Sequence, residues 1–320
     1  MKSVTISQMR ANEEVEGFFL IRSIQIKTTN QNKKYLDLTL ADKTGEINAK
    51  KWECKKEDEE RYQIGSVIKA RGQVSEWQNK LQLKIFLMRL TEKDDDIVIQ
   101  NLVPAAPESG ETMFNYIFDK VSSFEDEELK KLVIYILEDK RMKLLYYPAA
   151  KSNHHAILSG LLYHILRMLE VGEKLSKIYN NINRELLLSG IILHDIQKTE
   201  ELNANELGIV SAYTIEGTLL GHIIMGIKYI EEIGKKLEIS QEKIMLLEHM
   251  LLSHHYEPEY GSPVKPMIPE GELLHYIDMI DARMYDMDKH LKEVEEGTFS
   301  EQIFSLDRRR LYKAKIKEEK

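Results

Sequence analysis

The chain has 320 residues, with 42% hydrophobic and 31% charged side chains and a net charge of −8. That length is enough for about two domains of roughly 150 residues each, and the composition is too apolar for a disordered chain. A single cysteine, Cys54, excludes a disulfide framework and a multi-cysteine zinc site. Because no apolar run is long enough for a membrane span and the first residues lack an apolar leader, we expect a cytoplasmic protein without a membrane partner.

Charge and histidine are unevenly distributed along the chain. Residues 1–90 contain 17 Lys and Arg against 12 Asp and Glu, whereas residues 91–320 contain 28 against 41. All ten histidines lie between His154 and His290. The first part is therefore mildly basic, as nucleic-acid-binding domains often are, and the second is acidic and rich in potential metal ligands.

The first part of the chain has the alternating pattern of β-strands. Apolar and β-branched residues recur with a period of two between turn signals, in five segments: 18–26, 35–40, 46–52, 67–74 and 81–85. One acidic, helix-forming stretch at 54–62 follows the third segment. Five strands with a helical insert after the third are the element order of an OB-fold barrel. The segments LADKTGEINAKKWE and IGSVIKARGQVSEWQNKLQLKI also resemble nucleic-acid-type OB domains, so we predict such a domain over residues 1–92.

Aromatic and basic side chains of this barrel are candidates for nucleic-acid binding. Tyr35 shares its strand face with Asp37 and is expected to point outward, and Trp77 lies near the turn between strands four and five. Aromatic rings stack on bases, while lysine and arginine contact phosphates. The candidate residues are Tyr35, Trp52, Trp77, Lys33, Lys34, Arg71 and Lys80. The alternative for the aromatic residues is that some of them only fill the barrel interior.

The pattern changes after the predicted barrel. An acidic run followed by two prolines and a glycine indicates a linker over residues 93–112. From there on, apolar residues recur every three or four positions, which is typical of amphipathic helices. We expect an all-α helical bundle over residues 113–300 and a basic, frayed tail over residues 301–320. The clearest helices are predicted at 153–175, 184–196, 216–237, 240–254 and 270–292.

The sharpest local feature is an almost wholly apolar helix that ends in His194, Asp195 and Lys198. Burying a lone carboxylate is costly, so Asp195 must be paired or bound to a cation. An imidazole beside a carboxylate suits Mn, Fe, Co or Zn better than Ca. One such pair is not a complete site, and further ligands must come from elsewhere in the chain.

Further candidate ligands interrupt other apolar helices. They are His164, His222, His254, His255 and Asp278, and they resemble ligands that project into the core of a helical bundle. Asp278 and Asp281 lie three residues apart on one helix, where like charges repel unless a cation or base intervenes. Periodicity alone does not choose between these two. His154 and His155 stand at the start of a predicted helix, a position more typical of surface or capping residues.

The order of these residues resembles the HD superfamily of metal-dependent phosphohydrolases. That resemblance implies a single-metal set of His164, His194, Asp195 and Asp278. It further implies that His222 and either His254 or His255 complete a two-metal site, and that Lys198 contacts phosphate. Gln197 stands where this superfamily usually has glycine, a departure that removes no ligand.

Longer segments of the sequence indicate one family within this superfamily. The segments YPAAKSNHHA, GLLYH, LSHH and GSPV together resemble YhaM-type 3′–5′ exoribonucleases, which join an N-terminal OB domain to an HD domain. The resemblance implies an exonuclease that uses a metal-activated water to hydrolyse single-stranded RNA to nucleoside 5′-monophosphates. Whether single-stranded DNA is a second substrate stays open. His194, Asp195 and Lys198 are then catalytic, and His154 and His155 become candidates for a substrate contact.

The expected cofactor is one or two divalent ions, with Mn²⁺ first and Co²⁺, Fe²⁺ or Zn²⁺ as alternatives. A homo-oligomer remains an option that the residues do not decide. Two other functions stay open. The first is an HD phosphohydrolase that acts on nucleotides or cyclic dinucleotides, with the barrel as an interaction module. The second is a non-catalytic nucleic-acid-binding factor.

Overall fold

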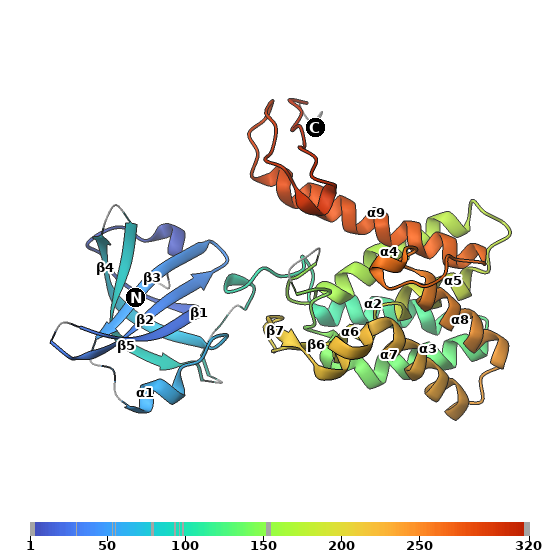
Figure 1. The fold of residues 1–320 in the computed structure, drawn as a ribbon, viewed down its shortest axis with the longest axis horizontal. Helices are drawn as coiled ribbons and strands as arrows, with labels where there is room; N and C mark the ends of the chain where they lie inside the picture. The colour runs from blue at the N-terminus through green and yellow to red at the C-terminus, as the bar shows by residue number, and fades with distance from the viewer. Residues whose placement is uncertain are drawn as a thin grey trace. The chain divides into compact units, whose positions relative to one another are not determined.

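The computed structural model describes residues 4–316 except 30, 53, 55, 78, 79, 93, 96, 98 and 152–154. The chain divides into two compact units, Met1–Ala105 and Ala106–Lys320, coloured blue to teal and green to red in Figure 1. Each unit has its own hydrophobic core. Among the described residues, no helix combines the length and the apolar character that a membrane crossing needs.

The first unit is a closed five-stranded barrel with the order β1-β2-β3-β5-β4, which confirms the predicted OB fold. Its strands are β1 (Glu14–Thr28), β2 (Lys34–Asp42), β3 (Gly45–Trp52), β4 (Val67–Trp77) and β5 (Lys80–Leu90), with α1 (Lys56–Arg61) after β3. Strands β3 and β5 pair in parallel and the other neighbours are antiparallel. The short 3₁₀ helices η1 (Ile6–Gln8) and η2 (Ile99–Asn101) flank the barrel in sequence.

The period of two in the sequence explains this barrel. On β2, Leu36, Leu38 and Leu40 are buried, whereas Tyr35 and Asp37 on the opposite face are not. Successive side chains of a strand point to opposite faces, so one face of each strand fills the interior and the other meets solvent. The polar and aromatic residues of the outer face are therefore available to a ligand.

Part of the expected linker packs against the barrel. Arg89 at the end of β5 forms a bidentate ion pair with Asp95, with distances of 2.7 and 2.6 Å. This guanidinium, with a backbone hydrogen bond, holds the pKa of Asp95 well below its ordinary value. Leu102 and Val103 are buried. The backbone N–H of Lys43 on the barrel donates to the carbonyl of Asn101 at 2.9 Å, and the first unit extends to Ala105.

The second unit is a helical bundle, as predicted. Its helices are α2 (Gly110–Ser122), α3 (Glu127–Leu144), α4 (Gly160–Ser176), α5 (Arg184–Leu193), α6 (Lys198–Glu201), α7 (Ile215–Lys236), α8 (Gln241–Ser253) and α9 (Pro269–Lys292). Side chains of Ser109, Asp126, Asn183 and Thr214 cap α2, α3, α5 and α7. All residues of α5 from Leu186 to Leu193 are buried, so α5 is the central element of the bundle.

Two details differ from the expected all-α unit. Strands β6 (Leu202–Ala204) and β7 (Val210–Tyr213) form an antiparallel hairpin. These strands are too short to show a period in the sequence. Helix α4 begins at Gly160, not near 153, because His155 and Ser159 adopt positive φ angles of 52° and 58°. A right-handed helix cannot continue through such residues.

The C-terminal segment also differs from the frayed tail that its charge predicted. Backbone bridges join Phe299 to Tyr312 and Ile303 to Arg309, which makes a hairpin of residues 299–312. The 3₁₀ helix η4 (Phe304–Leu306) in this hairpin packs against α9, and Leu306 is fully buried. Ile303 and Leu306, which precede the basic residues, are buried, and burial of each contributes roughly 1.5–3 kcal/mol to folding this segment back.

Candidate metal centre and nucleic-acid interface

The candidate ligands come together where several helices end. His194 and Asp195 follow the last turn of α5, and His254 caps α8. Helix α7 is interrupted at Gly221, whose φ of 69° is the conformation that glycine adopts at least cost. The interruption sets the next residue, His222, with its Nε2 at 3.2 Å from Asp195 Oδ1.

Asp195 lies at the centre of this group. Its Oδ2 accepts a hydrogen bond from Lys198 Nζ at 2.6 Å and lies 3.3 Å from His194 Nε2. The Nε2 atoms of His164 and His254 each lie 4.0 Å from an Asp195 oxygen. On α9, Asp278 Oδ1 lies 3.3 Å from His164 Nε2. The residues of the expected metal set thus surround a single small volume.

Several atoms that face this volume have no hydrogen-bond partner among the residues that the structure describes. They include His194 Nε2, Asp195 Oδ1, His222 Nε2 and His254 Nε2, all buried. The other ring nitrogens of His194 and His254 donate to the carbonyls of Ile191 and Leu251 at 2.8 and 2.7 Å. Each Nε2 therefore presents a lone pair. Buried polar atoms without partners cost about 1–3 kcal/mol each, and a divalent cation would satisfy all of them together.

The donor set suits a transition metal. Three groups of ligand atoms in this region lie within 4.8 Å of one another: His164, His194 and Asp195; His194, His254 and Asp278; and His222, His254 and His255. Imidazole nitrogen with carboxylate oxygen is a combination typical of Mn, Fe, Co or Zn sites. The three overlapping groups offer enough donors for one ion or for two neighbouring ions.

Electrostatics keep Asp195 and His254 in the forms that ligands need, whereas for His164 the effect of burial is outweighed by Asp278 and Asp281, which raise its pKa to about 9. Burial opposes ionisation of Asp195, but Lys198 and His194 hold its pKa well below the ordinary value. Burial and the neighbouring His255 lower the pKa of His254, so its imidazole is neutral. Lys198 stays charged because Asp195 raises its pKa against the effect of burial. Anionic carboxylate and neutral imidazole are the states in which these groups bind metals.

A further set of residues forms hydrogen bonds with the candidate histidine ligands and fixes their orientation. Asp281 accepts hydrogen bonds from His155 Nε2 at 2.7 Å, His164 Nδ1 at 2.8 Å and Arg167 Nε at 2.5 Å. Glu201 Oε1 lies 3.2 Å from His222 Nδ1. Such partners fix the tautomer and the ring orientation of a ligating histidine. Periodicity did not distinguish Asp278 from Asp281. In the structure, Asp278 lies on the Nε2 side of His164 and Asp281 on its Nδ1 side.

Some residues occupy places that the sequence did not indicate. His155, a candidate substrate contact, is fully buried behind His164 and bonded to Asp281, whereas His154 lies outside the described residues. Arg167 and Glu201 were not singled out, since a lone charged residue on a helix gives no distinguishing signal. Gln197 has a φ of −80°, which any residue adopts, so the turn after Asp195 does not require glycine.

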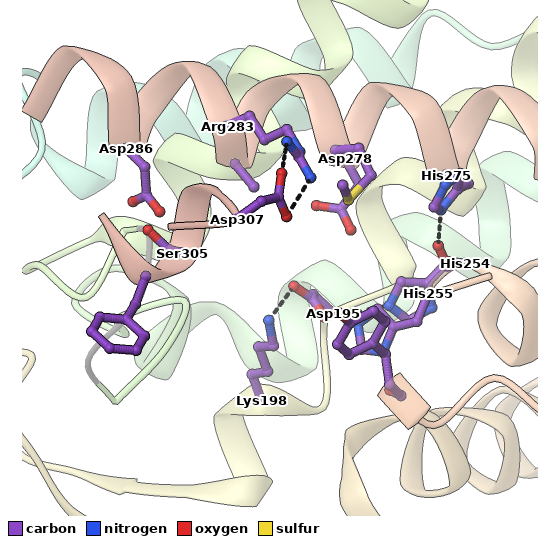
Figure 2. A pocket seen from close by; sticks show the side chains of 14 residues that line it. Asp195, Lys198, His254, His255, His275, Asp278, Arg283, Asp286, Ser305 and Asp307 are labelled. Carbon is purple, nitrogen blue, oxygen red and sulfur yellow. Dashed lines mark hydrogen bonds and ion pairs between the residues drawn. The ribbon is translucent and has the colours of Figure 1, made fainter. Parts of the chain in front are cut away.

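A cavity of about 450 Å³ opens beside this centre. Figure 2 shows Asp195, Lys198 and Asp278 around a common space, with the Arg283–Asp307 ion pair next to them. His255 also lines the cavity, and its Nδ1 lies 2.5 Å from the carbonyl of Tyr260. Small-molecule sites typically measure roughly 300–1,000 Å³. The cavity therefore has the size of a site for one nucleotide.

On the barrel, the structure pairs two of the candidate aromatic residues. Tyr35 on β2 stands opposite Trp52 on β3, with ring centroids 4.7 Å apart. Lys50 Nζ lies 5.7 Å and 6.0 Å from the two rings. Trp52 and Trp77 are 41% and 65% exposed, which is unusual for tryptophan in a small domain. Exposed rings beside a cation are suited to base stacking and phosphate contact.

The predicted cations of the barrel differ in their surroundings. Lys33, Lys34 and Lys80 are exposed. Arg71 instead lies 2.6 Å from Glu14 in an ion pair. Lys51, the neighbour of Lys50, faces the other way and pairs with Asp58 at 2.7 Å.

Comparisons with known proteins agree with this description. Residues 161–283 match the family model of the HD domain, and residues 20–90 match that of the OB-fold nucleic acid binding domain. The fold and the site thus define a protein that joins an OB domain to an HD domain with a candidate metal centre. This confirms the predicted architecture.

Curated relatives place the chain more narrowly. A protein named 3′-5′ exoribonuclease YhaM from Oceanobacillus iheyensis is 40% identical over 307 residues, which cover 96% of each chain. Proteins of the same name from a Geobacillus species and from Halalkalibacterium halodurans are 40% and 39% identical, covering 96% and 97% of this chain and 94% and 96% of theirs. The chain belongs to the YhaM family, and the predicted enzyme class, a hydrolytic nuclease, is confirmed.

Proposed function

We propose that this protein is a metal-dependent 3′–5′ exoribonuclease that removes nucleoside 5′-monophosphates from single-stranded RNA. The observation that carries the proposal is the convergence of buried, unpartnered ligand atoms on Asp195, beside a cavity that a nucleotide fits. The names of the relatives supply the direction and the substrate class.

The residues present fit one or two divalent ions, with Mn²⁺ as the proposed metal. The ligands are His164, His194, Asp195 and Asp278 for one ion, with His222, His254 and His255 available to a second. A bound ion of this kind polarises phosphoryl oxygens and lowers the pKa of water, so that hydroxide is available near neutral pH.

The protein's own residues position the phosphate. Lys198 is held charged at 2.6 Å from Asp195 and lines the cavity. There its ammonium offsets the charge that develops on the phosphoryl oxygens. Hydrolysis breaks the bond between phosphorus and the 3′ oxygen of the preceding nucleotide. That oxygen leaves as the new 3′ hydroxyl, and the released nucleotide keeps the phosphate on its 5′ oxygen.

The barrel holds the strand. Bases stack on Tyr35, Trp52 and Trp77, and Lys50 together with the exposed lysines contacts the phosphates. Stacking needs only the flat face of an unpaired base, so this surface favours single strands and accepts DNA as well as RNA. The acidic helical unit, with 41 Asp and Glu in residues 91–320, leaves most of the polyanion capture to the barrel.

The test is a 5′-labelled, unstructured oligoribonucleotide incubated with the full chain and Mn²⁺. We expect a ladder of products that shorten one nucleotide at a time from the 3′ end, and mononucleotides as the other product. An intact oligomer alongside hydrolysed nucleotides or cyclic dinucleotides would show that the substrate is small. Binding without any hydrolysis at any divalent metal would leave only a nucleic-acid-binding factor.

A further inference from the structure

The cavity beside the metal centre has a second end that the chemistry described above does not use. The last turns of α9 and the C-terminal hairpin form this end, with Asp286, Phe304, Ser305 and Asp307 in its wall. Figure 2 shows Asp286 extending from α9 toward Ser305, well apart from Asp195 and Lys198.

Asp286 contributes its carboxylate to the wall of the cavity. It is 7% exposed, and among the described residues it has no hydrogen-bond donor and no ion pair. The other buried acidic residues of the described chain each accept a hydrogen bond; they are Asp42, Asp58, Asp195, Glu270 and Asp281. Unlike Asp195 Oδ1, the carboxylate oxygens of Asp286 are not enclosed by protein, so they face the open space of the cavity. A carboxylate kept there, facing a cavity, is therefore suited to accept a hydrogen bond from a ligand.

An aromatic ring stands near this carboxylate. Phe304 lines the same cavity and is 79% exposed, and the Arg308 guanidinium lies 5.2 Å from its ring centroid. The turn that follows it is strained, since Asp307 and Arg308 both adopt positive φ, at 56° and 57°. Strain of this kind costs about 1–3 kcal/mol per residue and persists where the surroundings enforce it. Here Arg283 on α9 holds Asp307 at 2.9 Å.

The spacing along α9 fits one nucleoside. Asp278 and Asp286 are eight residues apart, which is about 12 Å at about 1.5 Å per residue. Ala282 lies between them in the cavity wall, and its small side chain leaves the intervening space open. A phosphate at the metal ligands and a sugar hydroxyl at Asp286 can thus belong to one nucleotide.

We propose that this end of the cavity binds the 3′-terminal nucleoside of the substrate, with its base on Phe304 and its 3′ hydroxyl donating to Asp286. The inference rests on the proposed exoribonuclease function and explains its preference for an end. In a strand that continues past this nucleoside, a phosphate replaces the free hydroxyl. The Asp286 carboxylate repels that phosphate, so internal positions and 3′-phosphorylated ends are disfavoured.

The experiment compares two oligoribonucleotides that differ only in a 3′ hydroxyl or a 3′ phosphate. The full chain with Mn²⁺ should degrade the first much faster. In Asp286→Asn, the ratio of the two kcat/KM values should fall at least about tenfold, since hydrogen bonds to charged groups are worth about that much. Asp288→Asn is the matched control, because Asp288 is paired with Lys292 on the same helix outside the cavity. It should keep the wild-type ratio.

A second pair of variants tests the ring. Phe304→Leu should raise KM for the 3′-hydroxyl oligomer about tenfold and Phe304→Tyr should restore it, because stacking needs a flat ring. The control Phe299→Leu lies on the same hairpin, against Tyr312 and not in the cavity wall. Thermal unfolding and metal analysis show that each variant is folded and loaded; Asp286→Asn should unfold near the wild-type temperature, because the carboxylate faces the cavity.

The outcomes separate the inference from the function on which it rests. An unchanged end preference in Asp286→Asn, in a wild-type protein that shortens RNA stepwise, overturns the inference and leaves the function standing. Equal degradation of the 3′-hydroxyl and the 3′-phosphate oligomers by the wild type also overturns the inference and leaves the function standing. A wild type that hydrolyses bis(p-nitrophenyl) phosphate but shortens neither oligomer overturns both.

Discussion

The two units of this protein use polar residues in opposite ways. In the barrel, the interior is apolar, and the candidate binding residues such as Trp52 and Lys50 stand on the outer face. In the helical unit, the ionisable groups are inside, and His164, His194, Asp195 and His254 are almost fully buried. One unit presents its chemistry on a surface, and the other holds it within a core.

This difference predicts how mutations will behave. Exposed groups on the barrel can exchange their contacts for water, so each substitution there removes a limited share of binding. The buried groups share partners, as when Asp281 serves His155, His164 and Arg167 at once. Groups within one network are not additive, so removing one member there disturbs the whole centre.

The largest effect is expected at Asp195. Asp195→Asn keeps the size of the side chain but loses the charge that its neighbours face. Because metal ions contribute several kcal/mol to stabilising the transition state, hydrolysis should fall more than about 10³-fold, while RNA affinity measured by fluorescence anisotropy stays unchanged. Asp119→Asn, on the exposed surface of α2, is the control. Activity within tenfold of wild type would remove Asp195 from the centre.

Asp281→Asn should have the next largest effect, because an amide cannot accept from all three donors that Asp281 holds. Loss of such an orienting partner typically lowers metal affinity or activity by about 10- to 100-fold. We expect weaker binding in a metal titration and recovery of activity at higher metal concentration. Glu173→Gln breaks a different arginine pair, with Arg184, in the same bundle. It should reduce stability without changing metal affinity; a similar loss of metal affinity there would show that the effect is not specific.

On the barrel, Trp52→Ala should weaken RNA binding by about 1–3 kcal/mol, the contribution of one stacked base. At saturating RNA, the turnover number should stay at the wild-type value, because Trp52 belongs to the unit without the metal centre. Tyr179→Ala, an exposed aromatic residue of the helical unit, provides the comparison. A matching fall in turnover for Trp52→Ala would contradict the separation of binding from hydrolysis.

The smallest effect is expected at Lys50 and concerns salt. Lys50→Gln should reduce the slope of log affinity against log salt by about 0.7, the value for one phosphate contact on a single strand. Its neighbour Lys51 points away and pairs with Asp58, so Lys51→Gln should lower thermal stability and leave the slope unchanged. Equal slopes for the two variants would mean that the outer face does not contact phosphates.

Much of the fold followed from local pattern. Alternation over residues 18–85 predicted the barrel because a strand with one buried face must place apolar residues at every second position. The apolar run Leu186–Leu193 predicted a buried helix, and the ionisable groups at its end predicted a centre. The hairpin of β6 and β7 and the late start of α4 escaped prediction, since strands of three or four residues and positive φ at Ser159 leave no periodic signal.

The sequence by itself determined which residue types are available, their order, and therefore the family resemblance. Only the tertiary structure decided their arrangement. His155 and His164 meet Asp281 across 126 and 117 residues of chain, and Asp307 reaches Arg283 through a turn at positive φ. Such contacts depend on how helices pack, not on local spacing. The same packing places Asp286 in the cavity wall, without a hydrogen bond or an ion pair to another described residue, a property of its surroundings that no sequence pattern encodes.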